Sequence, residues 1–178
     1  MILIYILMRI RYKPPMSASR HLDFDRLPAT ERLVLITLRA RIDGCRGSSV
    51  ETLYRIACGL AWVERAMASF DSLAETLVTG ARRPLRIGRL ADARVTCDEQ
   101  CLLGLLAAHQ LEQTGYAEAR MRWLVRSAFL APLAAHAGAF ARALARSGRM
   151  LSPAWLEPPS RALRAPAPAA QSPRQQIL

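Results

Sequence analysis

The chain has 178 residues, enough for one domain, and its 52% apolar content is sufficient for a hydrophobic core, which excludes a chain that is disordered throughout. Aromatic residues make up only 6%, so the core must consist mainly of Leu, Ala, Ile and Val, a composition that favours packed helices over a β-sandwich. The net charge of +11 excludes an acidic protein and favours negatively charged partners, whether nucleic acid, anionic lipid or an acidic protein.

Genome composition accounts for part of this charge. Lys13 is the only lysine among the 25 basic residues, and alanine is abundant. Arginine and alanine have GC-rich codons, so this usage is typical of a bacterial protein from a GC-rich genome. The charge therefore indicates affinity for polyanions in general without selecting one of them.

The N-terminal segment, residues 1–19, is first apolar and then basic. The apolar run MILIYILM precedes Arg9, Arg11 and Lys13, whereas a secretory signal peptide has its positive charges first. The run is also too short to cross a bilayer. We interpret the segment either as a mis-called start, with Met16 as the true initiator, or as an anchor. With no signal peptide recognised, we expect a cytoplasmic protein with reduced cysteines and no membrane span.

Two helices are predicted in the first half of the chain. The first begins near Pro28, because proline is well tolerated at the first helical position. The second begins at Ser48, which has the spacing of a capping box with Glu51 three residues later. Apolar residues at three-and-four spacing continue it, with a bend expected at Gly59 and an end at Gly80.

Residues 81–96 break the helical pattern. Alternation of apolar residues with arginine or glycine indicates a short β-hairpin within residues 84–96. A second capping box, Thr96 with Glu99, then predicts a helix that runs to Leu111.

Two further helices are predicted over Tyr116–Phe129 and Leu133–Arg146. The apolar stretch Ser127–Ala141 is interpreted as a core helix pair or an interfacial segment, with no membrane crossing. Six prolines in the Ala-rich segment that follows predict a disordered C-terminal tail over residues 151–178. The sequence therefore predicts an all-α bundle of about five helices, with or without one short hairpin, over residues 20–150.

Two short segments resemble known families. Residues 27–38 (LPATERLVLITL) resemble the opening of the helix-turn-helix of sigma factors, which implies DNA contact, but Leu60–Ser69 lacks the basic and hydroxyl pattern of a recognition helix. Residues 105–119 (LLAAHQLEQTGYAEA) resemble the middle of a tetratricopeptide hairpin, with no second copy in the chain. Neither match is long enough to assign a family.

The main candidate site is a segment of closely spaced arginines opposed only by Asp92. Guanidinium groups bind phosphate bidentately, so an extended strip of them is suited to a nucleic-acid backbone; its members are Arg82, Arg83, Arg86, Arg89 and Arg94. The alternative is a solvated face, and no aromatic residue is interleaved for base stacking. A second stripe follows one side of the last helix at Arg142, Arg146 and Arg149.

The four cysteines allow a weaker hypothesis. Cys97 and Cys101 lie one helical turn apart and His109 two turns further on, so with Cys45 and Cys58 they offer the thiolate and imidazole ligands that zinc prefers. Irregular spacing favours packed thiols instead. Cys97 at a helix start, with His109 as base, is also a candidate nucleophile.

An enzyme is the less favoured class, because the carboxylates are scattered, the close pair Asp98 and Glu99 suits a helix start, and no glycine-rich phosphate loop is present. The leading hypothesis is a non-catalytic binding or regulatory module without a cofactor that contacts nucleic acid or another polyanion through Arg82–Arg94. The alternatives are a helical protein-interaction adaptor that uses Tyr116–Arg149, and a zinc site. The sequence leaves the oligomeric state open.

Overall fold

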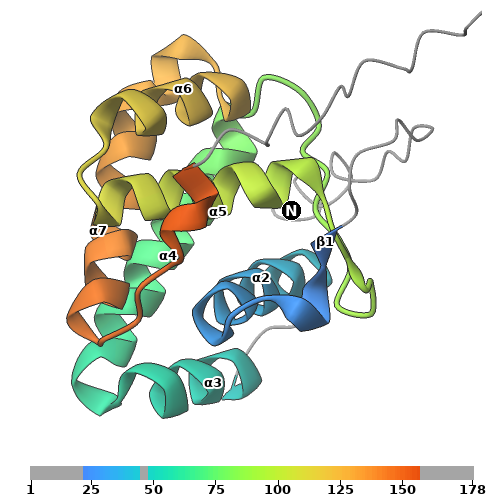
Figure 1. Cartoon of the computed structure of the whole chain (residues 1–178), viewed down its shortest axis with the longest axis vertical. Helices are drawn as coiled ribbons and strands as arrows, with labels where there is room; N and C mark the ends of the chain where they lie inside the picture. Colours follow the sequence, from blue (N-terminus) through green and yellow to red (C-terminus); the bar gives the residue numbers. More distant parts are fainter. Residues whose placement is uncertain (1–21, 45–47, 157–178) are drawn as a thin grey trace, which may run out of the picture.

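The computed structural model describes residues 22–44 and 48–156 of the chain. Six α-helices lie within these residues, together with one short strand pair and three short 3-10 helices (Figure 1). In chain order the elements are β1 (Leu22–Asp23), η1 (Phe24–Arg26), α2 (Ala29–Ile42), α3 (Ser48–Cys58), α4 (Leu60–Gly80), β2 (Arg94–Val95), α5 (Cys97–Gln110), α6 (Thr114–Leu124), η2 (Ser127–Phe129), α7 (Leu130–Arg146) and η3 (Pro153–Leu156). The predicted all-α bundle is confirmed.

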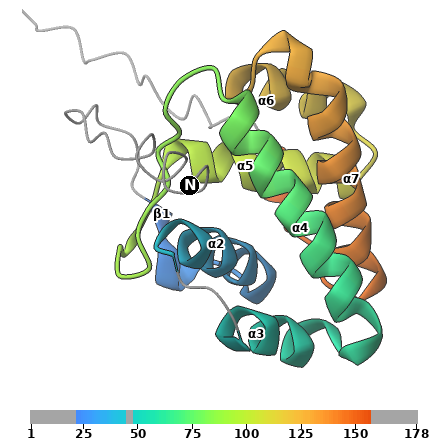
Figure 2. The same cartoon turned by 180° about the vertical axis from the view of Figure 1, so that it is seen from behind.

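The helix predicted to run from Ser48 to Gly80 with a bend is in fact two helices. Gly59 separates α3 from α4 and has a φ of +77°, a left-handed conformation that side chains rarely adopt. The chain turns there, so α3 lies across one end of the molecule while α4 runs its length beside α7 (Figures 1 and 2).

The core is built around α5. Every residue from Cys101 to Ala108 is buried, because α5 packs against α6 on one side, α7 on another, and η3 and α2 on the rest. A helix that is apolar on all sides in this way is expected at the centre of a bundle. Aromatic packing joins the neighbouring helices: the rings of Phe70 on α4 and Phe140 on α7 meet edge to face, with centroids 5.4 Å apart.

The predicted short strand pairing is present, but its partner differs from the one expected. Val95 pairs with Leu22 and Arg94 with Asp23, so β2 is antiparallel to β1 and not to residues 85–87. The two halves of the segment between α4 and α5 form no strand ladder with each other, although the segment turns and returns. It runs along the side of the molecule from α6 past β1, turns where the Asp92 N–H donates to the Arg89 carbonyl, and comes back to α5, where the Thr96 hydroxyl donates to the Arg86 carbonyl (Figure 1).

A buried ion pair holds this segment against α2. Arg39 and Glu99 are both fully buried, with Nε 2.7 Å from Oε1. The Arg39 guanidinium also donates to the carbonyls of Asp92 and Arg94, and the Glu99 carboxylate accepts the backbone N–H of Gly88 and of Thr96. The pair therefore fixes the backbone on both sides of β2.

Packing continues past residue 150, where the sequence placed the domain boundary. Leu151 is buried, and the indole N–H of Trp155 donates to Oε1 of buried Glu31, as does the backbone N–H of Ser152. The described part of the chain thus adds residues 151–156 to the bundle. The predicted N-terminal segment 1–19 and residues 157–178 of the predicted tail 151–178 lie outside the described residues.

One stretch within the described residues, Ser127–Arg146, is long and apolar enough to pass a composition test for a membrane span. After η2 the stretch consists of α7, whose buried face packs on α4 and α5. A core helix passes the same test, so the described residues contain no clear membrane span.

Replacing Arg39 with Met would leave the Glu99 carboxylate buried without its cation. We expect the free energy of unfolding, measured by urea denaturation, to fall by about 3–5 kcal/mol. The matched control is Arg41→Met on the same helix, whose ion pair with Asp71 is about half exposed, so its loss costs less than about 1 kcal/mol. Equal losses in the two variants would contradict the role given to the buried pair.

Candidate nucleic-acid interface

Asp98, at the start of α5, organises the surface next to the arginine segment. Its carboxylate is buried and accepts two hydrogen bonds from the Arg83 guanidinium, at 2.6 and 2.8 Å. It also accepts the backbone N–H of Arg86 at 2.7 Å and the indole N–H of Trp123 at 3.4 Å. One carboxylate therefore ties the arginine segment to α6.

Arg83 lies between this carboxylate and an aromatic ring. Its guanidinium carbon is 5.1 Å from the centroid of the Trp123 ring, a cation–π distance. Trp123 nevertheless remains 56% exposed. Burial alone would raise the pKa of Asp98, but the hydrogen bonds from Arg83 and Arg86 outweigh it, so the pKa is held below its usual value; hydrogen bonding to Asp98 likewise raises the pKa of Arg83.

Backbone pairing between the residues after α4 and those after α6 brings two further arginines, Arg82 and Arg126, close to each other. Ala81 forms an antiparallel bridge with Val125, and the Arg82 N–H donates to the Leu124 carbonyl while the Arg126 N–H donates to Gly80. Each guanidinium then reaches a helix C-terminus, where carbonyls lack partners and carry negative partial charge: Arg82 donates to the Arg122 carbonyl of α6 and Arg126 to the Thr79 carbonyl of α4.

Arg82, Arg122 and Arg126 surround a small pocket of about 350 Å³ at the junction of α6 and α7. The remaining lining residues are Val125, Ser127 and Leu130, so no carboxylate lines it. We call this pocket, together with its neighbours around Asp98, the arginine–tryptophan surface; its members are Arg82, Arg83, Arg86, Arg122, Trp123 and Arg126.

The structure divides the five arginines that the sequence grouped together. Arg82, Arg83 and Arg86 belong to the arginine–tryptophan surface. Arg89 lies towards α2, where its Nε is 3.5 Å from Asp43, and Arg94 lies on β2. The split follows from the Arg39–Glu99 pair, which draws the second half of the segment to the α2 side.

The fold does not bring together the cysteine and histidine residues proposed as zinc ligands or as a nucleophile and its base. Cys97 is exposed, Cys58 is buried, and Cys101 is buried with its thiol facing the Arg120 carbonyl, where desolvation raises its pKa to about 11. His109 is on the same helix, about 12 Å beyond Cys101 and about 18 Å beyond Cys97 at the rise of an α-helix. Within the described residues no three His, Cys, Asp or Glu side chains are grouped to hold a metal. Cys45 lies outside these residues.

Sequence reasoning missed Trp123, Arg122, Arg126 and the role of Asp98. Asp98 and Glu99 were interpreted as favourable charges at a helix start, whereas each carboxylate is the partner of a particular arginine. The two adjacent acids that come four and five residues after Arg94, at the end of the arginine segment, were the pattern that pointed to such pairing. The contribution of α6 had no such pattern, because Trp123 lies far from the arginine segment in the chain.

Comparison of the chain with protein-family models, with curated proteins and with solved structures found no match. The assignment of function therefore depends on the geometry of the molecule.

Asp98→Asn tests whether one carboxylate organises this surface. Because the pKa of Asp98 is lowered on folding, its ionised form stabilises the protein above the ordinary aspartate pKa of about 3.9, and this contribution is lost as the pH falls below that value. We expect the variant to lose about 1–3 kcal/mol at neutral pH and the difference from the parent to shrink in acid.

Urea unfolding at a series of pH values measures this difference. Asp25→Asn, at an exposed position of η1, is the matched control. A loss in Asp98→Asn that is the same at all pH values, or no greater than in the control, would contradict the role of Asp98.

Proposed function

We propose that the protein binds nucleic acid through the arginine–tryptophan surface, with a preference for single strands. The observation that carries this proposal is the fixed position of Arg83 on the ring of an exposed tryptophan, beside four further arginines. The sequence alone offered the positive charge without an aromatic residue. The fold supplies Trp123 from a helix that follows the arginine segment.

The arginines are suited to contact phosphates. Asp98 and Glu118 compensate Arg83 and Arg122 in ion pairs of 2.6 Å, whereas the exposed Arg82, Arg86 and Arg126 add positive charge at the same surface. Arg82 and Arg126 are held by helix-terminal carbonyls and each keeps further N–H donors for a ligand. Charges of this kind bind a phosphate backbone without sequence preference and release counterions.

Trp123 accounts for the preference for single strands. An exposed indole stacks on any base, but a base within a duplex is already stacked on its neighbours. Asp98 and Arg83 hold the ring in place before a ligand arrives, so less side-chain freedom is lost on binding. A double strand would gain only the phosphate contacts.

The two alternatives from the sequence remain predictions. An adaptor predicts a co-purifying protein or self-association, and a zinc site predicts stoichiometric metal and destabilisation by a chelator. Both become the leading hypotheses if the following measurement finds no binding of nucleic acid.

Arg86→Gln with Arg122→Gln tests the phosphate contacts. With the full chain and a labelled single strand of about 12 nucleotides, fluorescence anisotropy across a salt series gives the slope of log K against log salt. Loss of two phosphate contacts is expected to reduce this slope by about 1.4 and to weaken binding at low salt.

The matched control changes the same charge at the opposite end of the molecule. Arg55 and Arg65 are exposed on α3 and α4, at the far end from α6 (Figure 2), so Arg55→Gln with Arg65→Gln should keep the parent slope. Equal slope changes in the two double variants would show that only net charge matters and would contradict the proposed surface.

Trp123→Leu tests base stacking separately from charge. We expect affinity for the single strand to fall by about 1–3 kcal/mol, or about 5- to 150-fold, because one stacked base is lost. The salt slope and the affinity for a duplex of the same length should be unchanged. A parallel loss for single strand and duplex would show that Trp123 acts only by supporting the arginines.

A further inference from the structure

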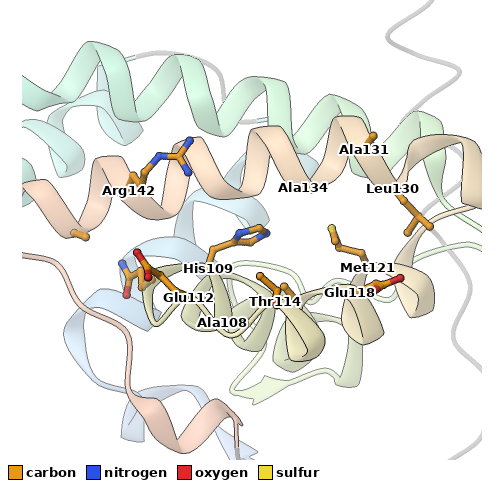
Figure 3. A pocket seen from close by; sticks show the side chains of 13 residues that line it. Ala108, His109, Glu112, Thr114, Glu118, Met121, Leu130, Ala131, Ala134 and Arg142 are labelled. Carbon is orange, nitrogen blue, oxygen red and sulfur yellow. The ribbon is translucent and has the colours of Figure 1, made fainter.

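A second site adjoins the arginine–tryptophan surface, in a groove between α5, α6 and α7, and Leu130 lines both pockets (Figure 3). Its volume of about 810 Å³ is within the range of small-molecule sites. Small side chains make room for it: Ala117 on α6 and Ala134 on α7 both line the groove. Met121 and Leu130 give one end an apolar lining, as Figure 3 shows.

The other end of the groove is polar. His109 projects from α5 into the groove, and Arg142 lies beside it on α7 (Figure 3). Both side chains pass over Gly138, where a Cβ would lie 3.1 Å from the Arg142 guanidinium and 3.4 Å from the His109 ring. The missing side chain at this position therefore leaves space for the imidazole and the guanidinium to lie together.

His109 has an unmet hydrogen-bonding requirement. Its Nε2 is inaccessible to solvent and has no partner among the residues that the structure describes. Burial lowers the pKa of His109, and the charge of Arg142 lowers it further, so the ring is neutral at physiological pH. A rotation of the neutral ring that turns a protonated Nε2 towards the groove would offer one donor to an acceptor held there.

The two carboxylates in the lining differ in their surroundings. Glu118 forms a hydrogen-bonded ion pair with Arg122 on the outer side of α6, with a separation of 2.6 Å. Glu112 lies in the turn between α5 and α6 with a φ of +56°, a conformation that costs energy for any residue with a side chain. Such strain is concentrated at functional sites, and here it occurs at the polar end of the groove.

We propose that the groove binds a small amphipathic carboxylic acid, with its carboxylate at Arg142 and His109 and its apolar chain along Met121, Leu130 and Ala134. The guanidinium supplies the opposite charge, and after a rotation of the imidazole that turns Nε2 towards the groove, the carboxylate accepts the hydrogen bond that His109 Nε2 lacks. The chain replaces water against alanine and methionine side chains. This site does not depend on the proposed binding of nucleic acid.

Titration of the full chain with sodium octanoate, followed by NMR of the histidine rings, tests the proposal. We expect a saturable shift of the His109 resonances without a matching shift of His136, and a rise in the His109 pKa on binding because the carboxylate offsets the charge of Arg142. Compared with octanoate, hexanoate should bind more weakly and decanoate more tightly, with a change in affinity of about fourfold per methylene. The uncharged analogue 1-octanol should bind about tenfold more weakly than octanoate.

Variants of opposite expected sign separate charge from folding. Arg142→Gln should weaken octanoate binding about tenfold, whereas Glu112→Gln removes a like charge and should strengthen it. Ala134→Phe fills the groove and should abolish binding, while the matched control Ala135→Phe, on the exposed side of α7 and outside the lining, should bind as the parent does.

The proposal is overturned if octanoate produces no saturable shift of His109, or if His136 shifts in parallel. It is also overturned if Ala134→Phe binds as tightly as Ala135→Phe. Equal affinity for octanol and octanoate would show that the carboxylate does not contribute to binding, which would contradict its proposed contacts with Arg142 and His109.

Discussion

The buried pair of Arg39 and Glu99 is the constraint on which the rest of the structure depends. Charges in a dry interior cost several kcal/mol to desolvate, and the cost is offset only when every donor and acceptor is satisfied. Here Glu99 receives four hydrogen bonds and Arg39 donates to two backbone carbonyls in addition. Together with the buried side chains of Leu85 and Val95, this arrangement specifies one path for an irregular segment.

Asp98 and Glu99 are neighbours in the chain, but their side chains leave α5 in different directions and meet different arginines. Glu99 faces inward to Arg39, and Asp98 faces the arginine–tryptophan surface. Both are in the first turn of the helix, where the backbone favours negative charge. The first turn of α5 therefore carries both the carboxylate of the buried ion pair and the carboxylate that positions the arginine–tryptophan surface.

Helix α6 takes part in both proposed sites. Ala117 and Met121 lie one turn apart and line the groove, whereas Arg122 and Trp123 belong to the arginine–tryptophan surface. The pair of Glu118 with Arg122 lies between the two sites. The two sites can nevertheless be tested separately, because neither the histidine and arginine of the groove nor its alanine wall belongs to the basic surface.

The sequence by itself determined the helical class of this protein and most of its helices. Apolar spacing and the Thr96–Glu99 capping box predicted the helices, because these depend on neighbours within one or two turns. The tertiary structure decided which partners distant residues found. Three features join segments that lie far apart in the chain: the pairing of Val95 with Leu22, the contact of Arg83 with Trp123, and the groove around His109. No local sequence pattern predicts these contacts. Side-chain charge and size permit such contacts, but only the packing of the helices selects them.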